Sequence, residues 1–340
     1  MGVLDLARAG ACACAILAAQ AAAADPVEDF YRGKTVQMLI GVSAGGEYDL
    51  HARLVARHIA RHIPGQPTVI AQNMTGAGGI VMANYLYGVA AKDGTYMGVI
   101  QNGHPTIQAT QAMKIGFDSG RFNWIGAISA TVETMALWKT AGVRTVEEAR
   151  AKGEIIVGSV GVSNITYTFP QMLNEFAGTQ FKIVSGYRGG SDINLAMERG
   201  EVLGRNNTWS SWTSTKPEWL RDKQIHILTW AGPRAPKGLE GVPSLEDLAR
   251  TAEDRVVIRL ITAGTRLGRP IATTPDAPPE RVKALRAAFQ AAMKDPDFLK
   301  EAQASRVEVD PVSGEELQKV VEEVLATPAH LSERGRRFLQ

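Results

Sequence analysis

The chain has 340 residues, which is long enough for two domains of ordinary size. Hydrophobic residues make up 45% and charged residues 21%, a composition that excludes a disordered chain. The 37 Lys and Arg residues nearly balance the 35 Asp and Glu residues, so the formal charge is only +2 and no nucleic-acid partner is expected. The most apolar stretch, at the N-terminus, is too short and alanine-rich to span a membrane, which excludes an integral membrane protein.

The first 24 residues predict an export signal. An apolar segment of small residues ends in an alanine run, the pattern of a signal peptide cleaved near Ala24. Cys12 and Cys14 both lie in this leader, so the rest of the chain has no thiol for a disulfide, a nucleophile or a metal site. Cys12 precedes most of the apolar core, which argues against a lipoprotein cysteine. We therefore expect the mature protein, beginning at Asp25, in the periplasm.

Apolar periodicity and turn signals after the leader predict alternating strands and helices. In chain order we expect strand 36–42, helix 49–63, strand 68–72, helix 78–89, strands 96–100 and 122–128, a short helix opened by a capping box at 145–148, strand 154–158, helix 165–176, strand 181–184, helix 191–199, strands 202–206, 225–229 and 256–261, and helices 279–294, 296–304 and 313–326.

The alternation predicts an α/β fold in two lobes with a ligand cleft between them. Strand–helix–strand units are typical of mainly parallel sheets flanked by helices. Two such sets follow one another without a long flexible linker. We place the junctions near residues 129–130 and 232–233, so residues 25–129 and 233–340 form a discontinuous first lobe and residues 130–232 form the second.

Four loops carry the candidate ligand-binding residues, because ligands of open α/β sheets bind where strand ends meet helix N-termini. Each loop combines glycines with small polar side chains before a predicted helix, so its free backbone N–H groups favour an anion. One such turn is usually only a tight turn, whereas four together favour a carboxylate site. The candidates are Ser43, Ala44, Gly45, Gly46 and Tyr48 in the first loop, Thr75, Gly76 and Ala77 in the second, Asn102 and His104 in the third, and Ser159, Gly161, Ser163 and Asn164 in the fourth.

Individual side chains near these loops have competing interpretations. Asp49 is expected to cap the first helix, or to place a negative charge at its N-terminus, rather than to contact a ligand. Glu47 is an exposed acid that would disfavour strongly anionic ligands. Arg188 would either pair with a ligand carboxylate or remain a solvated surface residue. Trp209 and Trp212 are expected to pack in the core rather than to line a ligand.

The enzyme and cofactor motifs are not met. The segment 76–78 lacks the third glycine of a dinucleotide fingerprint, and no P-loop occurs. Ser159 has Val157 rather than glycine two residues before it, so it is not a nucleophile elbow. The six histidines form no H-E-x-x-H motif. We expect a protein that is not an enzyme and that uses no cofactor and no metal.

Motifs along the whole mature chain resemble the substrate-binding proteins of tripartite tricarboxylate transporters, the Bug family. The resemblance implies a two-lobed periplasmic binding protein (type II-like) that closes on a small mono- or dicarboxylate held by backbone amides. It maps the first ligand loop onto residues 43–46 and the opposed loop onto Ser159, Gly161, Ser163 and Asn164. The motifs are Gly45-Gly46-x-x-Asp49, Asn73-x-x-Gly76-Ala77-Gly78-Gly79 with Asp93-Gly94-Thr95, Tyr187-Arg188-Gly189-Gly190, Val242-Pro243-Ser244-Leu245 and Lys294-Asp295-Pro296.

The resemblance also implies a monomer that delivers a small organic acid to membrane transporter subunits. The chain departs from the commoner family pattern at Ser43-Ala44 and at Thr75, which leaves the identity of the acid open. Two alternatives remain. The same fold would serve a ligand sensor for a membrane histidine kinase, and an exported serine hydrolase would pair Ser159 or Ser163 with His104. Saturable binding without a product separates a binding protein from the hydrolase.

Overall fold

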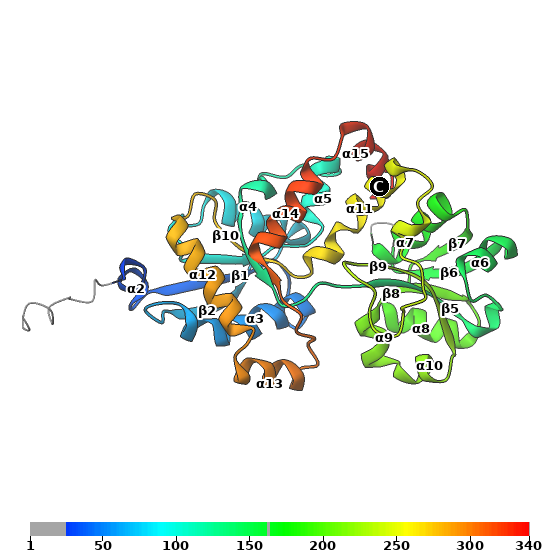
Figure 1. Ribbon diagram of the computed structural model, residues 1–340, viewed down its shortest axis with the longest axis horizontal. Helices are drawn as coiled ribbons and strands as arrows, with labels where there is room; N and C mark the ends of the chain where they lie inside the picture. The colour runs from blue at the N-terminus through cyan, green and yellow to red at the C-terminus, as the bar shows by residue number, and fades with distance from the viewer. Residues whose placement is uncertain (1–24, 162–163, 340) are drawn as a thin grey trace, which may run out of the picture.

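The chain folds into two lobes, each built on β-sheet structure covered by helices (Figure 1). The structure is a computed structural model that describes residues 25–161 and 164–339, so the predicted leader and Ser163 lie outside the described residues. The strands are β1 (Thr35–Ile40), β2 (Thr68–Asn73), β3 (Tyr96–Val99), β4 (Asn123–Ala127), β5 (Glu133–Trp138), β6 (Glu154–Ser159), β7 (Gln180–Ser185), β8 (Gly204–Thr208), β9 (Ile225–Ala231), β10 (Ile271–Thr273) and β11 (Val312–Ser313). The helices are α2 (Pro26–Tyr31), α3 (Glu47–Ile59), α4 (Ile80–Gly88), α5 (His104–Thr110), α6 (Val146–Lys152), α7 (Ile165–Met172), α8 (Gly190–Arg199), α9 (Trp209–Thr215), α10 (Pro217–Arg221), α11 (Ala252–Leu267), α12 (Pro279–Ala292), α13 (Pro296–Ala304), α14 (Gly314–Leu325) and α15 (Ala329–Arg336).

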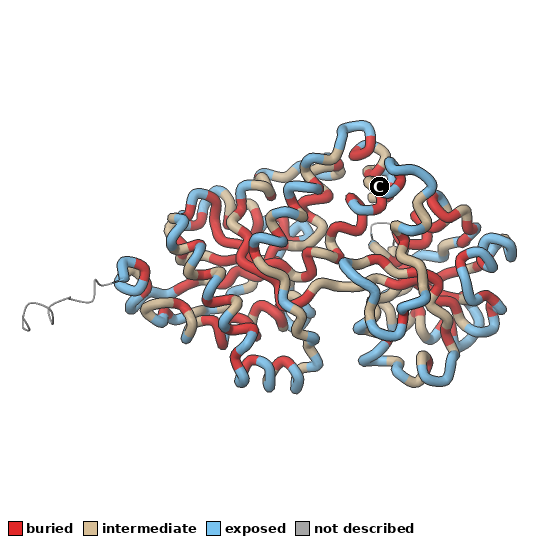
Figure 2. The backbone as a smooth tube through the Cα atoms, in the orientation of Figure 1, coloured by how far each residue is buried: buried red, intermediate tan, exposed pale blue. Residues whose placement is uncertain are grey.

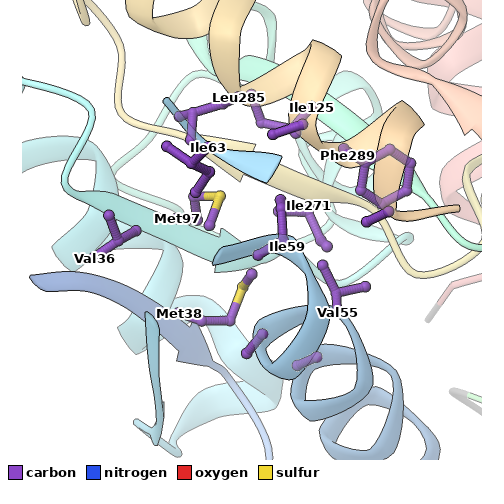
Figure 3. Close-up of a cluster of buried hydrophobic side chains, with 14 of the residues drawn as sticks. Val36, Met38, Val55, Ile59, Ile63, Met97, Ile125, Ile271, Leu285 and Phe289 are labelled. Carbon is purple, nitrogen blue, oxygen red and sulfur yellow. The ribbon is translucent and has the colours of Figure 1, made fainter. Parts of the chain in front are cut away.

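The first lobe is built on a mixed sheet in the order β11-β4-β10-β3-β1-β2. Strands β1, β2 and β3 are parallel, whereas β10 is antiparallel to both β3 and β4. Side chains of a strand alternate between the two faces of its sheet. Val36 and Met38 therefore point to one face, where Val55 of α3 and Phe289 of α12 close a core (Figure 3). Leu39 points to the other face and packs in a second cluster with residues of α4 and α14.

The second lobe combines the antiparallel strands β8-β5-β9 with the parallel pair β6-β7. Leu203 N–H donates to the carbonyl of Ile156 at 2.7 Å and joins the two sets. Met135 and Leu137 of β5 face a core that includes α6, α7 and α11, while Ala136 faces α8 and α9. Figure 2 shows buried residues concentrated along the strands of both lobes, with exposed residues on the outer helices and turns.

The segments that connect the lobes are hydrogen-bonded to each other. The chain leaves the first lobe after β4 and returns through the end of α11 (Figure 1). Thr131 N–H donates to the carbonyl of Thr265 at 2.8 Å where the two segments cross. Gly268 ends α11 with φ +63°, and a Cβ there would lie 1.9 Å from the carbonyl oxygen of Ser129. Only glycine fits this crossing without displacing the neighbouring backbone.

The lobe boundaries remain a prediction, and the packing indicates a second boundary later than residues 232–233. Leu245 N–H donates to the carbonyl of Trp230 at 2.7 Å, which returns the chain to β9. Most buried apolar residues of α11 belong to the same core as Met135. Phe338 packs on Phe176, with ring centroids 5.6 Å apart, so the C-terminal helix also covers this core. We infer a return to the first lobe near Gly268.

The structure confirms the two-lobed α/β fold and corrects two details. Residues 256–261, predicted as a strand, lie within α11. A short apolar run does not distinguish a buried strand from a helix, and here a capping box between Thr251 and Asp254 begins a helix of 16 residues. The sheets are also mixed rather than mainly parallel: β10 is antiparallel to β3 and β4 in the first lobe, and β5 is antiparallel to β8 and β9 in the second. In the part of the chain that the structure describes, no helix is long and apolar enough to cross a membrane.

Candidate ligand-binding site between the lobes

Two cavities lie where the lobes face each other. The first, here the cleft cavity, has a volume of about 770 Å³ and joins the start of α3 to α8, β8 and α9. The second, here the hinge cavity, has a volume of about 270 Å³ and adjoins the connecting segments. Residues lining the cleft cavity include Glu47, Gly190, Ser191, Asn194, Arg205, Asn207, Thr208 and Ser211. Residues lining the hinge cavity are Asn102, Gly103, Thr106, Ile107, Thr131, Glu133, Ile165, Ile261, Thr262, Gly264, Thr265 and Leu339.

Asp49 holds the first candidate loop in shape. Its carboxylate accepts hydrogen bonds from Gly45 N–H at 3.0 Å, from Arg53 Nε at 2.9 Å and from Asn73 Nδ2 at 2.9 Å. Burial pushes the pKa of Asp49 upward, but these hydrogen bonds outweigh it and hold the pKa at about 2. The carboxylate is therefore engaged within the loop. Asp49 places a negative charge in the first turn of α3, as expected, but it is not the N-cap, which is Gly46. Gly46, the N-cap of α3, has no side-chain cap, so first-turn N–H groups of this helix remain available.

The second and third loops are joined by a buried histidine. Gly76, Ala77, Gly78 and Gly79 all have positive φ, so this loop follows a path that favours glycine. His104 Nε2 hydrogen-bonds to the carbonyl of Gly78 at 3.1 Å, and the residue is only 1% exposed. Burial lowers the pKa of His104 to about 4, so the ring is neutral at physiological pH. His104 was predicted to contact the ligand, but it is buried and instead positions the second loop. The predicted residues Thr75, Gly76 and Ala77 of that loop are exposed.

Asn102 connects the first loop to α11 and lines the hinge cavity. Its backbone N–H donates to the Tyr48 hydroxyl oxygen at 3.2 Å, and its Nδ2 donates to the carbonyl of Gly264 at 3.0 Å. The Arg269 guanidinium lies 5.8 Å from the centroid of the Tyr48 ring. Two predicted residues, Asn102 and Tyr48, are thus brought together at the junction of the lobes.

The fourth loop begins α7 on the opposite lobe. Ser159 is completely buried, and its Oγ lies 3.1 Å from Thr166 Oγ1 and accepts from Gly161 N–H at 3.2 Å. Asn164 caps the helix by accepting from Thr166 N–H at 3.0 Å, and the next residue, Ile165, lines the hinge cavity. Ser159 and His104 bond to different partners in different loops, which argues against the serine–histidine pair of the hydrolase alternative.

The sequence analysis did not select Arg205, which lines the cleft cavity, or Arg269, which pairs with Glu47 of that lining; Arg188 does not line it. The Arg188 side chain is 96% exposed and lies 3.5 Å from Asp192, so it is a solvated surface residue. Arg205 on β8 is buried, and its Nη1 donates to the carbonyl of Gly190 at 2.6 Å and to Asn194 Oδ1 at 3.0 Å. Burial lowers the pKa of Arg205 to about 10, which still leaves it charged. The sequence signal that could have identified Arg205 is a single charged residue within an otherwise uncharged strand.

Arg269 and Glu133 are two further charged residues where the lobes face each other. Arg269 donates through Nη2 to the Glu47 carboxylate. Within the described residues, the buried atoms Arg269 Nε and Glu133 Oε2 have no hydrogen-bond partner. Burial raises the pKa of Glu133, although the neighbouring Asn206 amide and two nearby guanidinium groups counteract it. Glu133 escaped the sequence analysis because β5, which it begins, was not predicted.

The remaining candidates have structural surroundings. Trp212 is fully buried, and its Nε1–H donates to Thr134 Oγ1 at 3.0 Å, so it is a core residue as expected. Trp209 is half-buried on α9. Across the described ranges, no group of three or more His, Cys, Asp or Glu side chains is placed to hold a metal ion.

Comparisons with known proteins agree on one group of relatives. Residues 51–334 match the family model described as the tripartite tricarboxylate transporter family receptor. A Cupriavidus necator protein, described as the UPF0065 protein in gbd 5'region, is 27% identical over 253 residues, which are 72% of this chain and 73% of the relative. The fold is similar to that of a TctC solute binding protein from Polaromonas, with TM-score 0.70, 19% identity, and 89% and 99% of the two chains covered. It is also similar to MatC from Rhodopseudomonas palustris with bound malate, with TM-score 0.58, 18% identity, and 88% and 99% covered.

Proposed function

Because the chain belongs to the tripartite tricarboxylate transporter receptor family, we propose that it is a periplasmic receptor that captures a small organic carboxylate between its lobes and passes it to membrane transporter subunits. Its family and its fold neighbours are solute-binding receptors rather than enzymes. MatC, which has a similar fold, is known with bound malate, and this supports a small carboxylate as the ligand class here.

The observation that carries the proposal is that both lobes line the hinge cavity. Asn102 and Gly103 come from the first lobe, whereas Glu133 and Ile165 come from the second. The volume of about 270 Å³ is near the lower end of ligand pockets, which suits a molecule of few atoms. A ligand that contacts both lobes at once stabilises the arrangement in which they approach each other, so binding favours closure.

The groups around the cleft favour an anion. Helices α3 and α8 begin at Gly46 and Gly189 without a side-chain cap, and residues of both first turns line the cleft cavity. Free N–H groups and the positive end of the helix dipole attract a carboxylate. Arg269 adds a positive charge, which its ion pair with Glu47 partly offsets, and an Nε–H that has no partner in the described residues.

The test is direct binding to the protein beginning at Asp25, after unfolding and refolding to remove any ligand carried through purification. Isothermal titration and thermal unfolding with a panel of mono- and dicarboxylates should identify one chemical class that binds saturably. A ligand at about 100 times its Kd should add roughly 2.7 kcal/mol to the free energy of unfolding. NMR of the bound ligand should show no chemical change. If no acid in the panel binds, the proposal fails; if a product accumulates, the protein is an enzyme.

A further inference from the structure

The C-terminal part of the chain passes from the first lobe to the second. The first turns of α14 pack on the first lobe, where Leu317 and Val321 belong to the same buried cluster as Leu39. From Val324 onward the buried apolar residues, such as Leu331, belong instead to the core of the second lobe. Figure 1 shows this path, from α14 over the first lobe to α15 beside α11. The chain thus connects the lobes here as well as at the two crossing segments.

Residues 328–339, here the C-terminal strap, are hydrogen-bonded to a helix of each lobe. Arg336 Nε donates to the carbonyl of Thr110, the last residue of α5 in the first lobe, at 2.6 Å. Thr168 Oγ1 of α7, in the second lobe, donates to the carbonyl of Phe338 at 3.2 Å. The strap therefore ties α5 to α7 across the boundary between the lobes.

The two helices tied by the strap both begin at candidate ligand loops. Helix α5 follows Asn102 and Gly103, and α7 begins at Ile165 directly after Asn164. Asn102, Gly103 and Ile165 line the hinge cavity, and Leu339 of the strap lines it too. The strap therefore acts on the spacing of two loops that face a solute from opposite lobes.

The strap lies close to the contact between α5 and α11. Thr106 Oγ1 of α5 donates to the carbonyl of Leu260 in α11 at 2.9 Å. A Cβ on Gly335 of the strap would lie 2.8 Å from Leu260 Cδ2 and 3.6 Å from Thr110 Cγ2. Glycine at this position lets the strap approach residues of both helices closely.

The strap is anchored unequally on the two lobes. On the second lobe, Phe338 stacks on Phe176 with ring centroids 5.6 Å apart, and Arg334 Nη2 donates to Glu175 at 2.9 Å. On the first lobe it is held by its covalent connection to α14 and by the Arg336 hydrogen bond. Changes to these two attachments would release the first lobe and leave the apolar packing of α15 on the second lobe in place.

We propose that the C-terminal strap limits the rotation of the lobes and holds the free protein near the arrangement that binds the solute. Two crossing segments form a hinge about which lobes rotate, and a third attachment opposes that rotation. Lobes that sample fewer arrangements lose less conformational entropy on binding. The effect on affinity rests on the proposed receptor function, whereas the restraint on the lobes does not. If loosening the strap leaves the binding arrangement populated about a tenth of the time, the affinity for every solute falls about tenfold.

The test variant has a looser strap. It carries Arg336→Gln and an insertion of Gly-Ser-Gly-Ser between Thr327 and Pro328, in the connection between α14 and α15. The matched control carries the same insertion between Lys152 and Gly153, in the turn that joins α6 to β6 within the second lobe. Flexible insertions in surface turns are tolerated at a small entropic cost.

Spin labels on the two lobes measure their relative movement. Both cysteines of the chain lie in the leader, so Arg221→Cys on α10 and Lys300→Cys on α13 provide one labelling site on each lobe (Figure 1). Pulsed dipolar spectroscopy of the refolded, ligand-free protein should give a broader distance distribution for the loosened variant than for the unmodified protein, and the control should match the unmodified protein. Titration with malate, succinate and adipate should show every measurable affinity reduced about tenfold in the loosened variant and unchanged within a few-fold in the control.

An unchanged distance distribution in the loosened variant overturns the proposal, and so does equal broadening in the control. If the insertion prevents folding, Arg336→Gln alone decides in the same way, because it keeps the apolar packing of the strap. A broader distribution with unchanged affinity would mean that the strap restrains the lobes without favouring binding, which refutes the second part of the proposal. Absence of binding by every acid would refute the receptor function, and the distance measurement would still decide whether the strap restrains the lobes.

Discussion

Gly268→Ala tests whether the crossing between the connecting segments holds the two lobes in place. The added Cβ would lie 1.9 Å from the Ser129 carbonyl oxygen, whereas an ordinary contact is 3.4 Å or more, so one backbone must move by about 1.5 Å. At φ +63° and ψ −120° a non-glycine residue is strained by roughly 1–3 kcal/mol, and forcing atoms into a packed site costs roughly 1–3 kcal/mol. We therefore expect a loss of about 4 kcal/mol and a Tm lower by roughly 6 °C.

Gly153→Ala is the matched control for this substitution. Gly153 is also a helix C-cap, with φ +85° and ψ −134°, but a Cβ there meets no atom within 4 Å, so only the backbone strain of about 2 kcal/mol should appear. Calorimetry of both variants measures the difference, and small-angle scattering measures any change in the arrangement of the lobes. If Gly268→Ala costs no more than Gly153→Ala, the crossing does not constrain the lobes and the argument from the contact is wrong.

Three further substitutions test the loops of the cleft. Asp49→Asn should lower the free energy of unfolding at neutral pH by about 2 kcal/mol, because the folded pKa of about 2 lies below the ordinary value of 3.8. This stabilisation is complete above pH 4 and is lost as the pH falls through 2. Urea unfolding should therefore show a free energy of unfolding that depends less on pH across that range in the variant. Glu47→Gln releases its arginine partner and should raise the affinity for a carboxylate roughly threefold at low salt, and titration showing weaker binding would contradict this. Gly190→Ala places a Cβ 2.4 Å from Arg205 Nη1 and should weaken ligand binding about tenfold, whereas Gly189→Ala, with no atom within 4 Å, should leave the affinity within a few-fold.

Much of the fold was predictable because its information is local. The alternation of β1, α3, β2, α4 and β3 follows from apolar periodicity, and the structure reproduces these elements within a few residues. Strand β5 was missed because its residues follow no clear alternation, and its identity depends on pairing with β8 and β9 from much later in the chain. Helix α11 was misread because one apolar run suits either a buried strand or a buried helix until its neighbours are known.

The sequence by itself determined which loops carry glycines and small polar side chains, and it placed Asp49 at the N-terminus of the first helix as a structural residue. Only the tertiary structure decided which charged residues face one another between the lobes. Glu133, Arg205 and Arg269 are separated by dozens of residues. Arg205 is near Glu133 because β8 pairs with β5, and Arg269 follows the segment by which the chain returns to the first lobe. Arg188 and His104 were selected from the sequence as ligand contacts, but in the structure Arg188 is solvated and His104 is buried. Burial and charge pairing depend on long-range packing, and no local pattern encodes them.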